Sequence, residues 1–390
     1  MYENKLSESC LATPPSFIRA ILKTTESDEI ISFAGGLPNP VSFPMEDIKE
    51  STVRVIDTFG SKVFQYSQTA GLPELREYIA DRLNRTQGME LTAEDIIITT
   101  GSQQALDLIG KVFINKKDNI ILEEPGYLGA IQAFSQYQPT FHAIQLESDG
   151  MQMEQLEDTL KRYPVKFIYT VPNFQNPSGL TYSNEKREKL YELAHKYECI
   201  LIEDDPYGDL KFDGNPYGYI SKFDPSGSIL LGTFSKTVTP GMRLGYMVIK
   251  NKELRIRINT AKEAEDLHAN IFSQYILFDY LTHHDLEAHI TKIRKLYKEQ
   301  CATMICAMET YFPREVGFTR PEGGMFIWAT LPEGMSALKL FDKAKKENVV
   351  FVPGNPFYTD GREANTMRLN YTNSSNESII EGIKRLGKLF

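Results

Sequence analysis

A lysine lies between two short apolar segments of this 390-residue chain, with hydroxyl side chains and an arginine beside it. The apolar segments are residues 229–231 and 246–249, and each is typical of a buried strand. Two core strands would hold Lys236 on a rigid base. Burial and a fixed cation such as Arg243 would both lower the pKa of this lysine, and a neutral amine is the form that makes a Schiff base.

The side chains around Lys236 also have the chemistry of a phosphate site. Thr233 and Ser235 can donate hydrogen bonds from their hydroxyl groups, and Arg243 can pair with two phosphate oxygens at once. The alternative is that Lys236 is a solvated charge in a loop, because short motifs also occur by chance. The residues that follow the other predicted strands help to decide between these two interpretations of Lys236.

Two of those strand ends carry residues that could bind a flat, phosphorylated ligand. Ser102 and Gln103 begin a helix directly after the predicted strand 96–99, and the free N–H groups at a helix N-terminus bind anions. The alternative there is that Ser102 only caps the helix. Tyr127 follows the predicted strand 119–122, where it could stack on a planar ligand or pack as an ordinary aromatic residue.

Two further polar segments follow the predicted strands 166–170 and 200–202. Asn176 lies in an Asn-Pro-Ser-Gly turn, where its amide could donate to a ligand oxygen or could serve the turn alone. Asp204 and Tyr207 belong to an acidic segment at the end of an apolar strand, where buried carboxylates are costly unless they are paired. A solvated acidic cluster is the alternative interpretation of that segment.

Predicted strands and helices alternate between residues 96 and 202, which indicates an α/β fold with a mostly parallel sheet and helices on both faces. Ligands of such sheets bind beyond the carboxyl ends of the strands, which is where the residues above fall. The other expected helices are at 45–59, 72–86, 252–282, 285–312, 336–346 and 377–389, and the other expected strands are near 318, 325–329, 349–352 and 367–371.

This pattern predicts a large domain, a smaller α+β domain and an N-terminal arm. A short helix at 16–22 and a strand at 31–33 belong to residues 1–44, which we expect to form the arm and part of the small domain. We expect the large, ligand-binding domain at 45–282 and the rest of the small domain at 283–390.

Composition excludes several classes of function. A formal net charge of −9 argues against nucleic acid as the main partner, because the protein would repel phosphate backbones. No segment approaches the ~18 apolar residues of a membrane span, and the N-terminus lacks the apolar core of a signal peptide. We therefore expect a cytoplasmic protein without a membrane partner.

We expect no metal site in this protein. The four cysteines have no metal-ligand spacing and no pattern of a disulfide framework, so we expect them to be reduced. His283, His284 and His289 lie near a predicted helix boundary without a carboxylate at a recognised ligand spacing. We interpret these histidines as surface residues.

The order and spacing of these motifs resemble the fold-type-I, pyridoxal-phosphate-dependent aminotransferases of class I/II, and most of all the branch of 2-aminoadipate, kynurenine and aromatic aminotransferases. The resemblance extends from about residue 14 to the C-terminus. It rests on Tyr66 and Gly71, Gly101 to Gln104, Asn176 to Gly179, Asp204 to Tyr207, Ser235, Lys236 and Arg243, Pro321 to Trp328, Pro353 and Gly354, and Arg368 and Leu369.

The resemblance implies a role for each residue around the cofactor ring. Lys236 matches the lysine that holds pyridoxal 5'-phosphate covalently and then moves the substrate proton. Asp204 matches the carboxylate that keeps the ring nitrogen protonated, which makes the ring an electron sink. Tyr207 and Asn176 match the donors to the ring hydroxyl oxygen, and Tyr127 matches the residue stacked on the ring.

The resemblance also implies a phosphate site that two subunits share. Tyr66 matches a tyrosine that reaches the phosphate bound by the neighbouring subunit, so we expect a homodimer with shared active sites. The remaining phosphate-binding residues would be Ser102, Gln103, Thr233, Ser235 and Arg243.

Substrate binding is implied at three further positions. Arg368 matches the arginine that clamps the substrate α-carboxylate with its planar fork, and Asn176 is also expected to bind substrate. Gly36 and Arg19 match a segment that closes over the substrate. We hypothesise that Arg19 pairs with the distal carboxylate of an acidic substrate, and a solvated helix charge is the alternative.

The expected activity is transfer of an amino group between an L-amino acid and a 2-oxo acid such as 2-oxoglutarate by a ping-pong route. Aromatic, 2-aminoadipate-like and other donors remain open. A lyase or racemase that uses the same cofactor is the first alternative. A cofactor-binding sensor of a transcription regulator is the second, although it would need an N-terminal DNA-binding domain of about a hundred residues.

Overall fold

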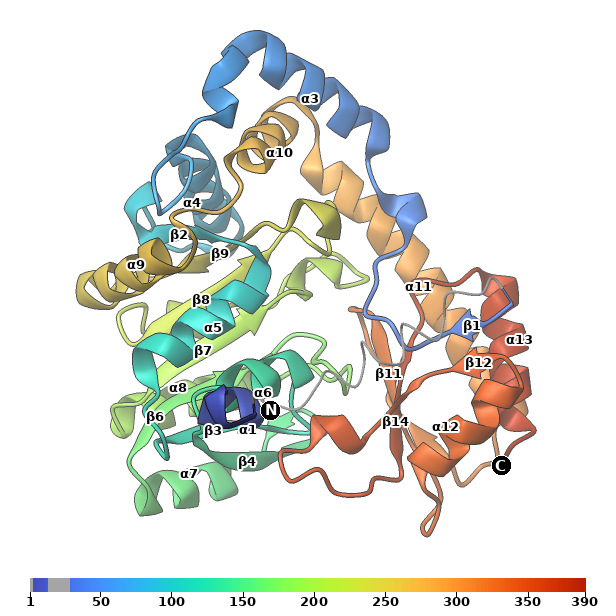
Figure 1. Cartoon of the computed structure of the whole chain (residues 1–390). Helices are drawn as coiled ribbons and strands as arrows, with labels where there is room; N and C mark the ends of the chain where they lie inside the picture. The colour runs from blue at the N-terminus through green and yellow to red at the C-terminus, as the bar shows by residue number, and fades with distance from the viewer. Residues whose placement is uncertain (1–2, 13–28) are drawn as a thin grey trace.

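The computed structural model describes residues 3–12 and 29–390, and it has the α/β fold that the alternating pattern predicts (Figure 1). Its large sheet has, in spatial order, β2 (Ile96–Thr99), β9 (Gly245–Val248), β8 (Ser228–Thr233), β7 (Ile200–Asp205), β6 (Val165–Thr170), β3 (Asn119–Glu124), β4 (Thr140–Glu147) and β5 (Gly150–Met151). The five strands from β8 to β4 are parallel, whereas β9 and β5 are antiparallel to their neighbours. The prediction of a mostly parallel sheet is therefore confirmed.

Helices cover both faces of this sheet, as predicted. The helices that follow its strands are α5 (Gly101–Phe113), α6 (Leu128–Ser135), α7 (Met153–Arg162) and α8 (Asn184–Lys196). Ile120 on β3 packs in one hydrophobic cluster with α5 and α6, whereas Ile121 packs in another with α7 and α8. Successive side chains of a strand point to opposite faces, so each strand contributes to both layers.

One predicted helix is in fact two. The segment expected as a single helix at 252–282 forms α9 (Lys252–Asp266) and α10 (Ile271–His283). Leu267 ends α9 with a positive φ of 61°, and the Asn270 side chain accepts a hydrogen bond from the Ser273 N–H as the N-cap of α10. An asparagine inside an apolar periodic segment was the signal that could have located this break.

The neighbouring helices agree closely with expectation. They are α3 (Met45–Phe59), α4 (Pro73–Gln87) and α11 (Leu286–Tyr311). Figure 1 shows α3 and α10 together at one end of the molecule, with α11 leading from there toward the C-terminal region. The short helix α1 (Glu8–Ala12) is described, but the helix expected at 16–22 lies outside the described residues.

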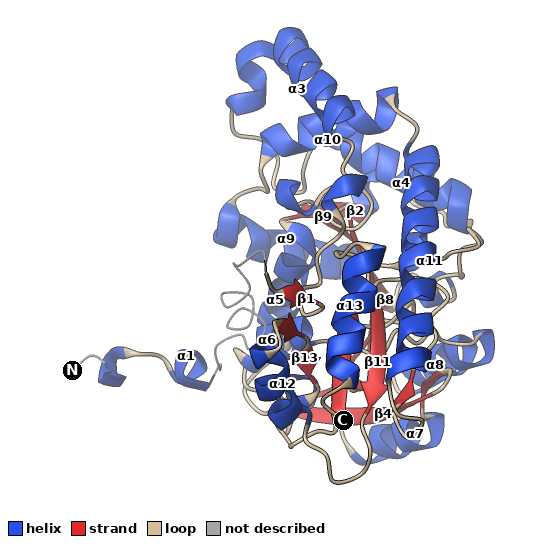
Figure 2. Ribbon diagram, turned by 90° about the vertical axis from the view of Figure 1, so that its right-hand side faces the viewer, coloured by secondary structure: helices blue, strands red, loops and turns tan. Residues whose placement is uncertain are grey.

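The C-terminal region forms a second, smaller sheet. It has four antiparallel strands in the order β10 (Gly317–Phe318), β11 (Phe326–Thr330), β14 (Thr366–Asn370) and β13 (Val352–Pro353). Beside it β1 (Ile31–Ser32) pairs in parallel with β12 (Val349–Val350), so the chain before residue 45 joins this region. The helices α12 (Ala337–Lys346) and α13 (Asn376–Gly387) complete it, and Figure 2 shows α13 beside α11. The domain boundaries at 44 and 283 stay a prediction.

Among the described α-helices and strands, four were not predicted: α1, β4, β5 and α7. The side chains of β4 are mostly half-exposed or exposed, because this strand lies near one edge of the sheet, and β5 contains only two residues. Neither strand presents the continuous apolar run that marks the central strands. Among the described residues, no helix is both long and apolar enough to cross a membrane.

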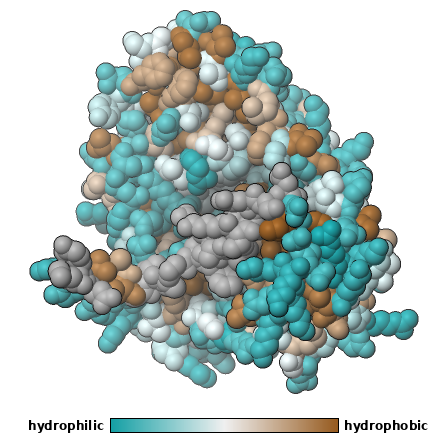
Figure 3. All heavy atoms as spheres, turned by 45° about the vertical axis from the view of Figure 1, so that its right-hand side comes forward, coloured by the Kyte–Doolittle hydropathy of each residue, from teal (hydrophilic) through white to brown (hydrophobic). Residues whose placement is uncertain are grey.

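Exposed apolar side chains gather at one end of the molecule. Figure 3 shows them in brown at the top of the view, the end that α3 occupies in Figure 1. They belong to α3 and to the 3-10 helix η3 (Gly60–Phe64) that follows it, and include Met45, Val53, Ile56 and Phe64. An apolar patch of this kind is typical of a protein–protein interface.

Candidate active site

A cavity of about 340 Å³ lies where the strands β6, β7 and β8 end, between the large sheet and the C-terminal region. It is lined by twelve of the fourteen residues that the sequence marks as site residues. They are Gly36, Ser102, Gln103, Tyr127, Asn176, Asp204, Tyr207, Thr233, Ser235, Lys236, Arg243 and Arg368. The carboxyl-end position of the cavity agrees with the general rule for open α/β sheets.

Lys236 extends into this cavity from the loop after β8. Its Nζ donates a hydrogen bond to the carbonyl oxygen of Gly36, at 2.8 Å. Burial lowers its pKa to about 8, and the cations Arg368 and Arg243 act in the same direction. Because an ordinary lysine has a pKa near 10.4, this amine is far more often neutral at physiological pH than a surface lysine is.

Asp204 lies at the end of β7 with only 1% of its surface exposed. Its Oδ2 accepts a hydrogen bond from the Tyr169 hydroxyl at 2.7 Å, whereas its Oδ1 has no partner among the described residues. Burial raises the pKa of this carboxyl to about 7, against the lowering effect of the Tyr169 hydrogen bond. An N–H donor or a cation in the cavity would satisfy Oδ1 and favour the ionised form.

Arg368 and Asn176 form the opposite wall. One Nη of Arg368 donates to Asn176 Oδ1 at 2.8 Å, and the other donates to the Ala34 carbonyl at 2.7 Å. The Asn176 amide in turn donates to the Tyr207 hydroxyl at 3.3 Å. The guanidinium lies 4.3 Å from the ring centre of Phe326.

Arg368 is only 2% exposed and forms no ion pair within the described part of the chain. Its Nε is buried without a hydrogen-bond partner there. Burial lowers its pKa to about 10, which reflects the cost of an unneutralised buried cation. An anionic ligand would relieve this cost, and a carboxylate fits the planar fork.

A further part of the cavity wall, which we call the phosphate wall, is suited to a phosphate group. Ser102 stands in the first turn of α5, and its hydroxyl is buried without a partner among the described residues. Thr233 donates to the Ser235 hydroxyl at 3.0 Å, and Arg243 occupies a left-handed turn with φ of 53°. Hydroxyl groups, a cation and the N-terminus of a helix together make an anion site.

Gly101 makes the close approach of α5 and Arg243 possible. Its φ is +71°, and a Cβ at this position would lie 2.7 Å from an Arg243 Nη atom. Any other residue would therefore displace the arginine from the phosphate wall. Tyr127, at the start of α6, lies in the same cavity, and burial raises its pKa to about 12, so its hydroxyl stays protonated.

Of the two remaining predicted residues, the one that the structure describes does not line the cavity. Tyr66 is 79% exposed, and its ring packs edge-to-face on His268 at 5.9 Å between ring centres. It does not contact the phosphate wall of its own subunit, so its predicted role in the neighbouring subunit stays a prediction. Arg19 lies outside the described residues.

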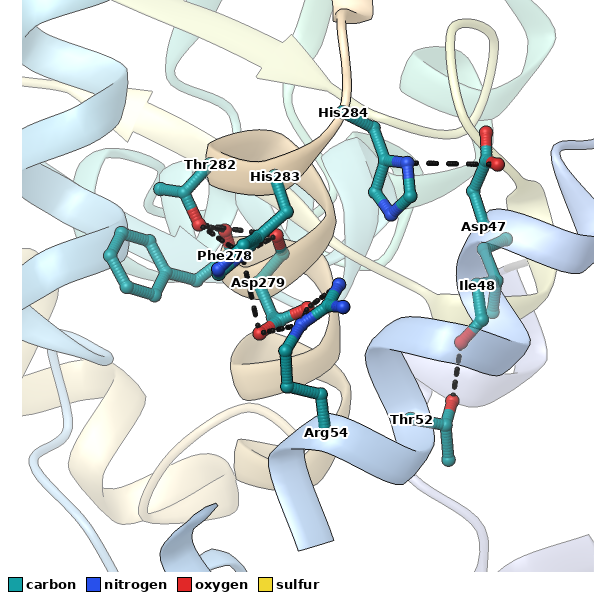
Figure 4. Close-up of polar contacts among 9 residues, drawn as sticks. All are labelled: Asp47, Ile48, Thr52, Arg54, Phe278, Asp279, Thr282, His283 and His284. Atoms are coloured by element: carbon teal, nitrogen blue, oxygen red, sulfur yellow. Dashed lines mark hydrogen bonds and ion pairs between the residues drawn. The ribbon is translucent and has the colours of Figure 1, made fainter. Parts of the chain in front are cut away.

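The three histidines lie around the junction of α10 and α11, and Figure 4 shows His283 and His284. His283 is exposed and lies beside Asp279, which accepts three hydrogen bonds from Arg54. His284 points toward Asp47 at 3.6 Å. The interpretation as surface residues is wrong for His284 and His289, since both are half-buried. In the described ranges, no group of three metal-binding side chains occurs.

Several residues in or next to the cavity were not assigned a role from the sequence. Leu37 and Pro38 line the cavity, and Tyr169 lies outside it and contacts Asp204. Tyr169 has no distinguishing signal, because it occupies a buried strand position where an aromatic residue is common. Phe326 was part of the motif, but its contact with Arg368 depends on the pairing of β11 with β14.

The unpartnered polar atoms of the cavity fit pyridoxal phosphate. Asp204 Oδ1 is suited to a protonated ring nitrogen, and the Ser102 hydroxyl to a phosphate oxygen. Lys236 lines the same cavity, and its lowered pKa of about 8 gives its amine a much larger neutral fraction than an ordinary lysine has. Tyr207 and Asn176 present a hydroxyl and an amide to the same space.

Known proteins resemble this chain over nearly its whole length. The family described as aminotransferase class I and II matches residues 34–386. An aromatic-amino-acid aminotransferase 1 of Thermococcus litoralis is 43% identical over 99% of this chain and 94% of its own length. A 2-aminoadipate transaminase of Thermus thermophilus is 38% identical over 96% of this chain and 93% of its own.

A solved structure extends the similarity to three dimensions. The kynurenine aminotransferase of Pyrococcus horikoshii, solved in complex with PMP, is 43% identical and superposes with a TM-score of 0.95. The match covers 99% of this chain and 97% of that one. The relatives therefore share the fold and the full extent of the chain.

Proposed function

The chain belongs to the class I and II aminotransferases and is a pyridoxal-phosphate-dependent transaminase of fold type I, and we propose that it transfers an amino group from an L-amino acid to a 2-oxo acid such as 2-oxoglutarate. The branch of its relatives favours aromatic, kynurenine or 2-aminoadipate-like donors. We further propose a ping-pong route, in which the donor leaves as an oxo acid before the acceptor binds.

The observation that carries this proposal is one cavity that holds Lys236, the unpartnered oxygen of Asp204 and the unpaired guanidinium of Arg368. When bound, pyridoxal phosphate supplies an aldehyde and an electron-withdrawing ring that delocalises the charge left by loss of the substrate α-proton. Asp204 would hold the ring nitrogen in its protonated form. Burial of Asp204 strengthens this charge pairing because little water screens it.

Lys236 is the residue suited to moving the proton. Its amine is free of any carboxylate partner among the described residues and is held only by the Gly36 carbonyl. With a pKa of about 8 it would be suited to accept the substrate α-proton near neutral pH. The flexible stem of lysine would let the amine carry that proton to a second position in the cavity.

Arg368 would orient the substrate by binding its α-carboxylate. One Nη is already aligned by Asn176 and the other by Ala34, so the fork is fixed before the substrate arrives. This pre-organisation lowers the entropy lost on binding. Leu37 and Pro38 at the opening would contact the substrate side chain, and an apolar contact suits aromatic donors.

We also propose that the protein acts as a homodimer. The apolar side chains of the patch on α3 and η3 are exposed, and pairing with a second copy would remove them from water. Tyr66 follows this patch directly and is exposed, which would let it reach the phosphate wall of the partner subunit. Analytical ultracentrifugation tests the dimer, and Tyr66→Phe tests the shared site through the affinity for the cofactor.

Arg19 is proposed to bind the distal carboxylate of acidic substrates. The proposal rests on the sequence, because a lone arginine lies on a short predicted helix near the expected substrate side of the site. Arg19→Ala should raise the KM for 2-aminoadipate or 2-oxoglutarate and leave the KM for aromatic donors unchanged. Equal KM values for the acidic substrates in the variant and the native protein would remove Arg19 from the substrate site.

The proposed compartment is the cytoplasm. Cys10 and Cys306 are exposed and Cys199 and Cys301 are buried, and all four are free thiols. Free exposed thiols are typical of proteins from reducing compartments.

Absorbance spectroscopy of the purified protein tests the proposed reaction. The band of the bound aldehyde form should disappear when a donor amino acid is added and return when 2-oxoglutarate is added. Two separable half-reactions would support the ping-pong route, and the rates with successive donors would rank them. A band that changes with amino acids but never converts to the amine form would contradict transamination and favour a lyase or racemase.

A further inference from the structure

The two oxygens of Asp204 have different environments. Oδ2 accepts the Tyr169 hydroxyl at 2.7 Å, and Oδ1 is buried in the cavity wall without a partner among the described residues. The next residue, Asp205, differs: it accepts hydrogen bonds from the Gly208 N–H and the Asn173 amide. Within the described ranges, Tyr169 provides the single hydrogen bond that fixes the Asp204 carboxylate.

Tyr169 is well placed to hold that carboxylate. It lies on β6, the strand next to β7, and it is only 1% exposed. Its ring packs edge-to-face on Phe134 at 5.8 Å between ring centres, so α6 restricts its movement. Burial raises the pKa of its hydroxyl well above the usual range, so the group remains a donor at every relevant pH.

Tyr169 does not line the cavity that would hold the cofactor. Among the described residues, its hydroxyl makes one hydrogen bond, to Asp204, so we expect its effect on the site to pass through that carboxylate. A carboxylate on a short side chain can rotate and exchange its two oxygens. A hydrogen bond to one oxygen prevents this rotation and leaves the other oxygen directed at the cavity.

We propose that Tyr169 is a positioning residue that holds Asp204 Oδ2 and thereby directs Oδ1 at the ring nitrogen of pyridoxal phosphate. The inference rests on the role proposed above for Asp204. The hydroxyl has a second effect, because a hydrogen bond to an ionised carboxylate stabilises the charged form. Without it, burial and the nearby Asp205 and Glu123 would act on Asp204 unopposed, and its pKa would rise further above about 7.

The test measures binding of pyridoxamine phosphate to the full-length chain after removal of the cofactor. This probe cannot bond covalently to Lys236, so its dissociation constant reports the ring and phosphate contacts alone. We expect Tyr169→Phe to weaken binding by about tenfold near about pH 6.5 and by about threefold or less near about pH 9, where Asp204 is ionised in both proteins. Isothermal titration calorimetry at several pH values measures the dissociation constants of the variant and the native protein, and their ratio gives the loss of affinity.

A matched control is Tyr182→Phe. The Tyr182 hydroxyl also donates to a buried carboxylate, that of Glu123, at 2.9 Å, but it lies outside the cavity. This variant should lower thermal stability without a pH-dependent change in the dissociation constant. If it reproduces the tenfold, pH-dependent loss of Tyr169→Phe, the effect is a general loss of core packing and the inference is overturned.

Asp204→Asn separates failure of this inference from failure of the proposed Asp204 role. If Asp204→Asn does not weaken binding, Asp204 does not contact the ring nitrogen and the premise fails. If it weakens binding but Tyr169→Phe has no effect at any pH, only the role of Tyr169 fails. In the double variant, the Tyr169 change should add less than about twofold, because coupled residues are not additive.

The double variant also distinguishes a loss of affinity that arises at the site from one that arises from poor folding. Circular dichroism and thermal unfolding establish whether Tyr169→Phe is folded at the temperature of the titration. A loss of affinity that persists unchanged in the Asp204→Asn background would come from the fold and would overturn the inference.

Discussion

Two buried carboxylates near the site, Glu123 and Asp204, are equally inaccessible to water but have opposite hydrogen-bonding environments. Both are 1% exposed. Glu123 accepts four hydrogen bonds, and its donors are the Thr170 hydroxyl, the Val171 N–H, the Gln175 amide and the Tyr182 hydroxyl. Asp204 accepts one, and its second oxygen has no partner among the described residues.

Two buried arginines show the same contrast. Arg187 and Arg368 are each 2% exposed. Arg187 donates to the carbonyl oxygens of Tyr182, Gly218 and Pro172 and to the Asn173 side chain. Arg368 has two acceptors and an Nε without one in the described part of the chain.

The difference separates structural polar groups from ligand-binding ones. Glu123 and Arg187, which we call the support pair, are satisfied by the protein itself and tie together the segment 170–187 that carries Asn176. Asp204 and Arg368 keep unused hydrogen-bonding capacity that faces a cavity. Since an unsatisfied buried polar group costs free energy, its presence indicates that a ligand completes the site.

The largest expected effect is on the cavity side, at Lys236. Lys236→Ala removes the group proposed to hold the cofactor and move the proton, so kcat should fall by at least about 10³-fold. The melting temperature of the cofactor-free protein should not fall, because the substitution removes a buried amine that has no carboxylate partner to offset the cost of burying it. Steady-state kinetics and calorimetry measure the two quantities.

Lys262 provides the matched control for this first prediction. It is a buried lysine whose Nζ is paired with Asp266 at 2.7 Å. Lys262→Met should lower the melting temperature, since it leaves the Asp266 carboxylate without its cationic partner. If Lys236→Ala destabilised the protein as much as Lys262→Met does, the contrast between satisfied and unsatisfied groups would not hold.

The two arginines should respond differently to the same substitution. Arg368→Lys should lower kcat/KM for the amino acid donor by about 10²-fold, because lysine cannot bind a carboxylate through a planar fork. Arg187→Lys should instead lower the free energy of unfolding by about 2–4 kcal/mol, because several of its four acceptors lose their donor. Steady-state kinetics and urea unfolding of Arg368→Lys and Arg187→Lys measure these two effects. A similar loss of stability in the two variants would contradict the predicted difference.

Glu123→Ala tests the support pair from its acidic side. The change leaves four buried donors without an acceptor, so the free energy of unfolding should fall by about 3–5 kcal/mol. Asp204→Ala should cost less than about 1 kcal/mol in the cofactor-free protein, because only the Tyr169 hydroxyl loses a partner. Equal losses would mean that the unpartnered oxygen of Asp204 is satisfied in solution by another group.

The smallest effect concerns pH. With a pKa of about 8 for Lys236, the neutral amine fraction should increase about fivefold between about pH 7 and 8 and about twofold more by about pH 9. The rate at which the cofactor-free protein captures pyridoxal phosphate should follow this curve in stopped-flow absorbance. A rate that continues to rise tenfold per pH unit up to about pH 10 would indicate an ordinary lysine and contradict the burial effect.

Much of the fold was predictable because its signals are local. The strand 96–99 and the helix 45–59 match the structure residue by residue, since an isoleucine run and an amphipathic period are contained within the segments themselves. The break near Leu267 and the edge strand 140–147 were missed. A break in an apolar helix depends on one turn, and an edge strand lacks the apolar run of a central one.

The amino-acid sequence by itself determined which residue types follow each strand, and therefore which chemistry meets at the carboxyl edge of the sheet. Lys236, Asp204 and Ser102 were assigned in this way, and all three line the cavity. What only the tertiary structure decided is which polar atoms stay unpartnered there. Those pairings join residues far apart in the chain, such as Tyr169 with Asp204, Arg368 with Asn176 and Lys236 with Gly36, at separations of 35, 192 and 200 residues. No local pattern in the sequence indicates such contacts, because they form only after strands have paired within the large sheet and the C-terminal region has packed against it.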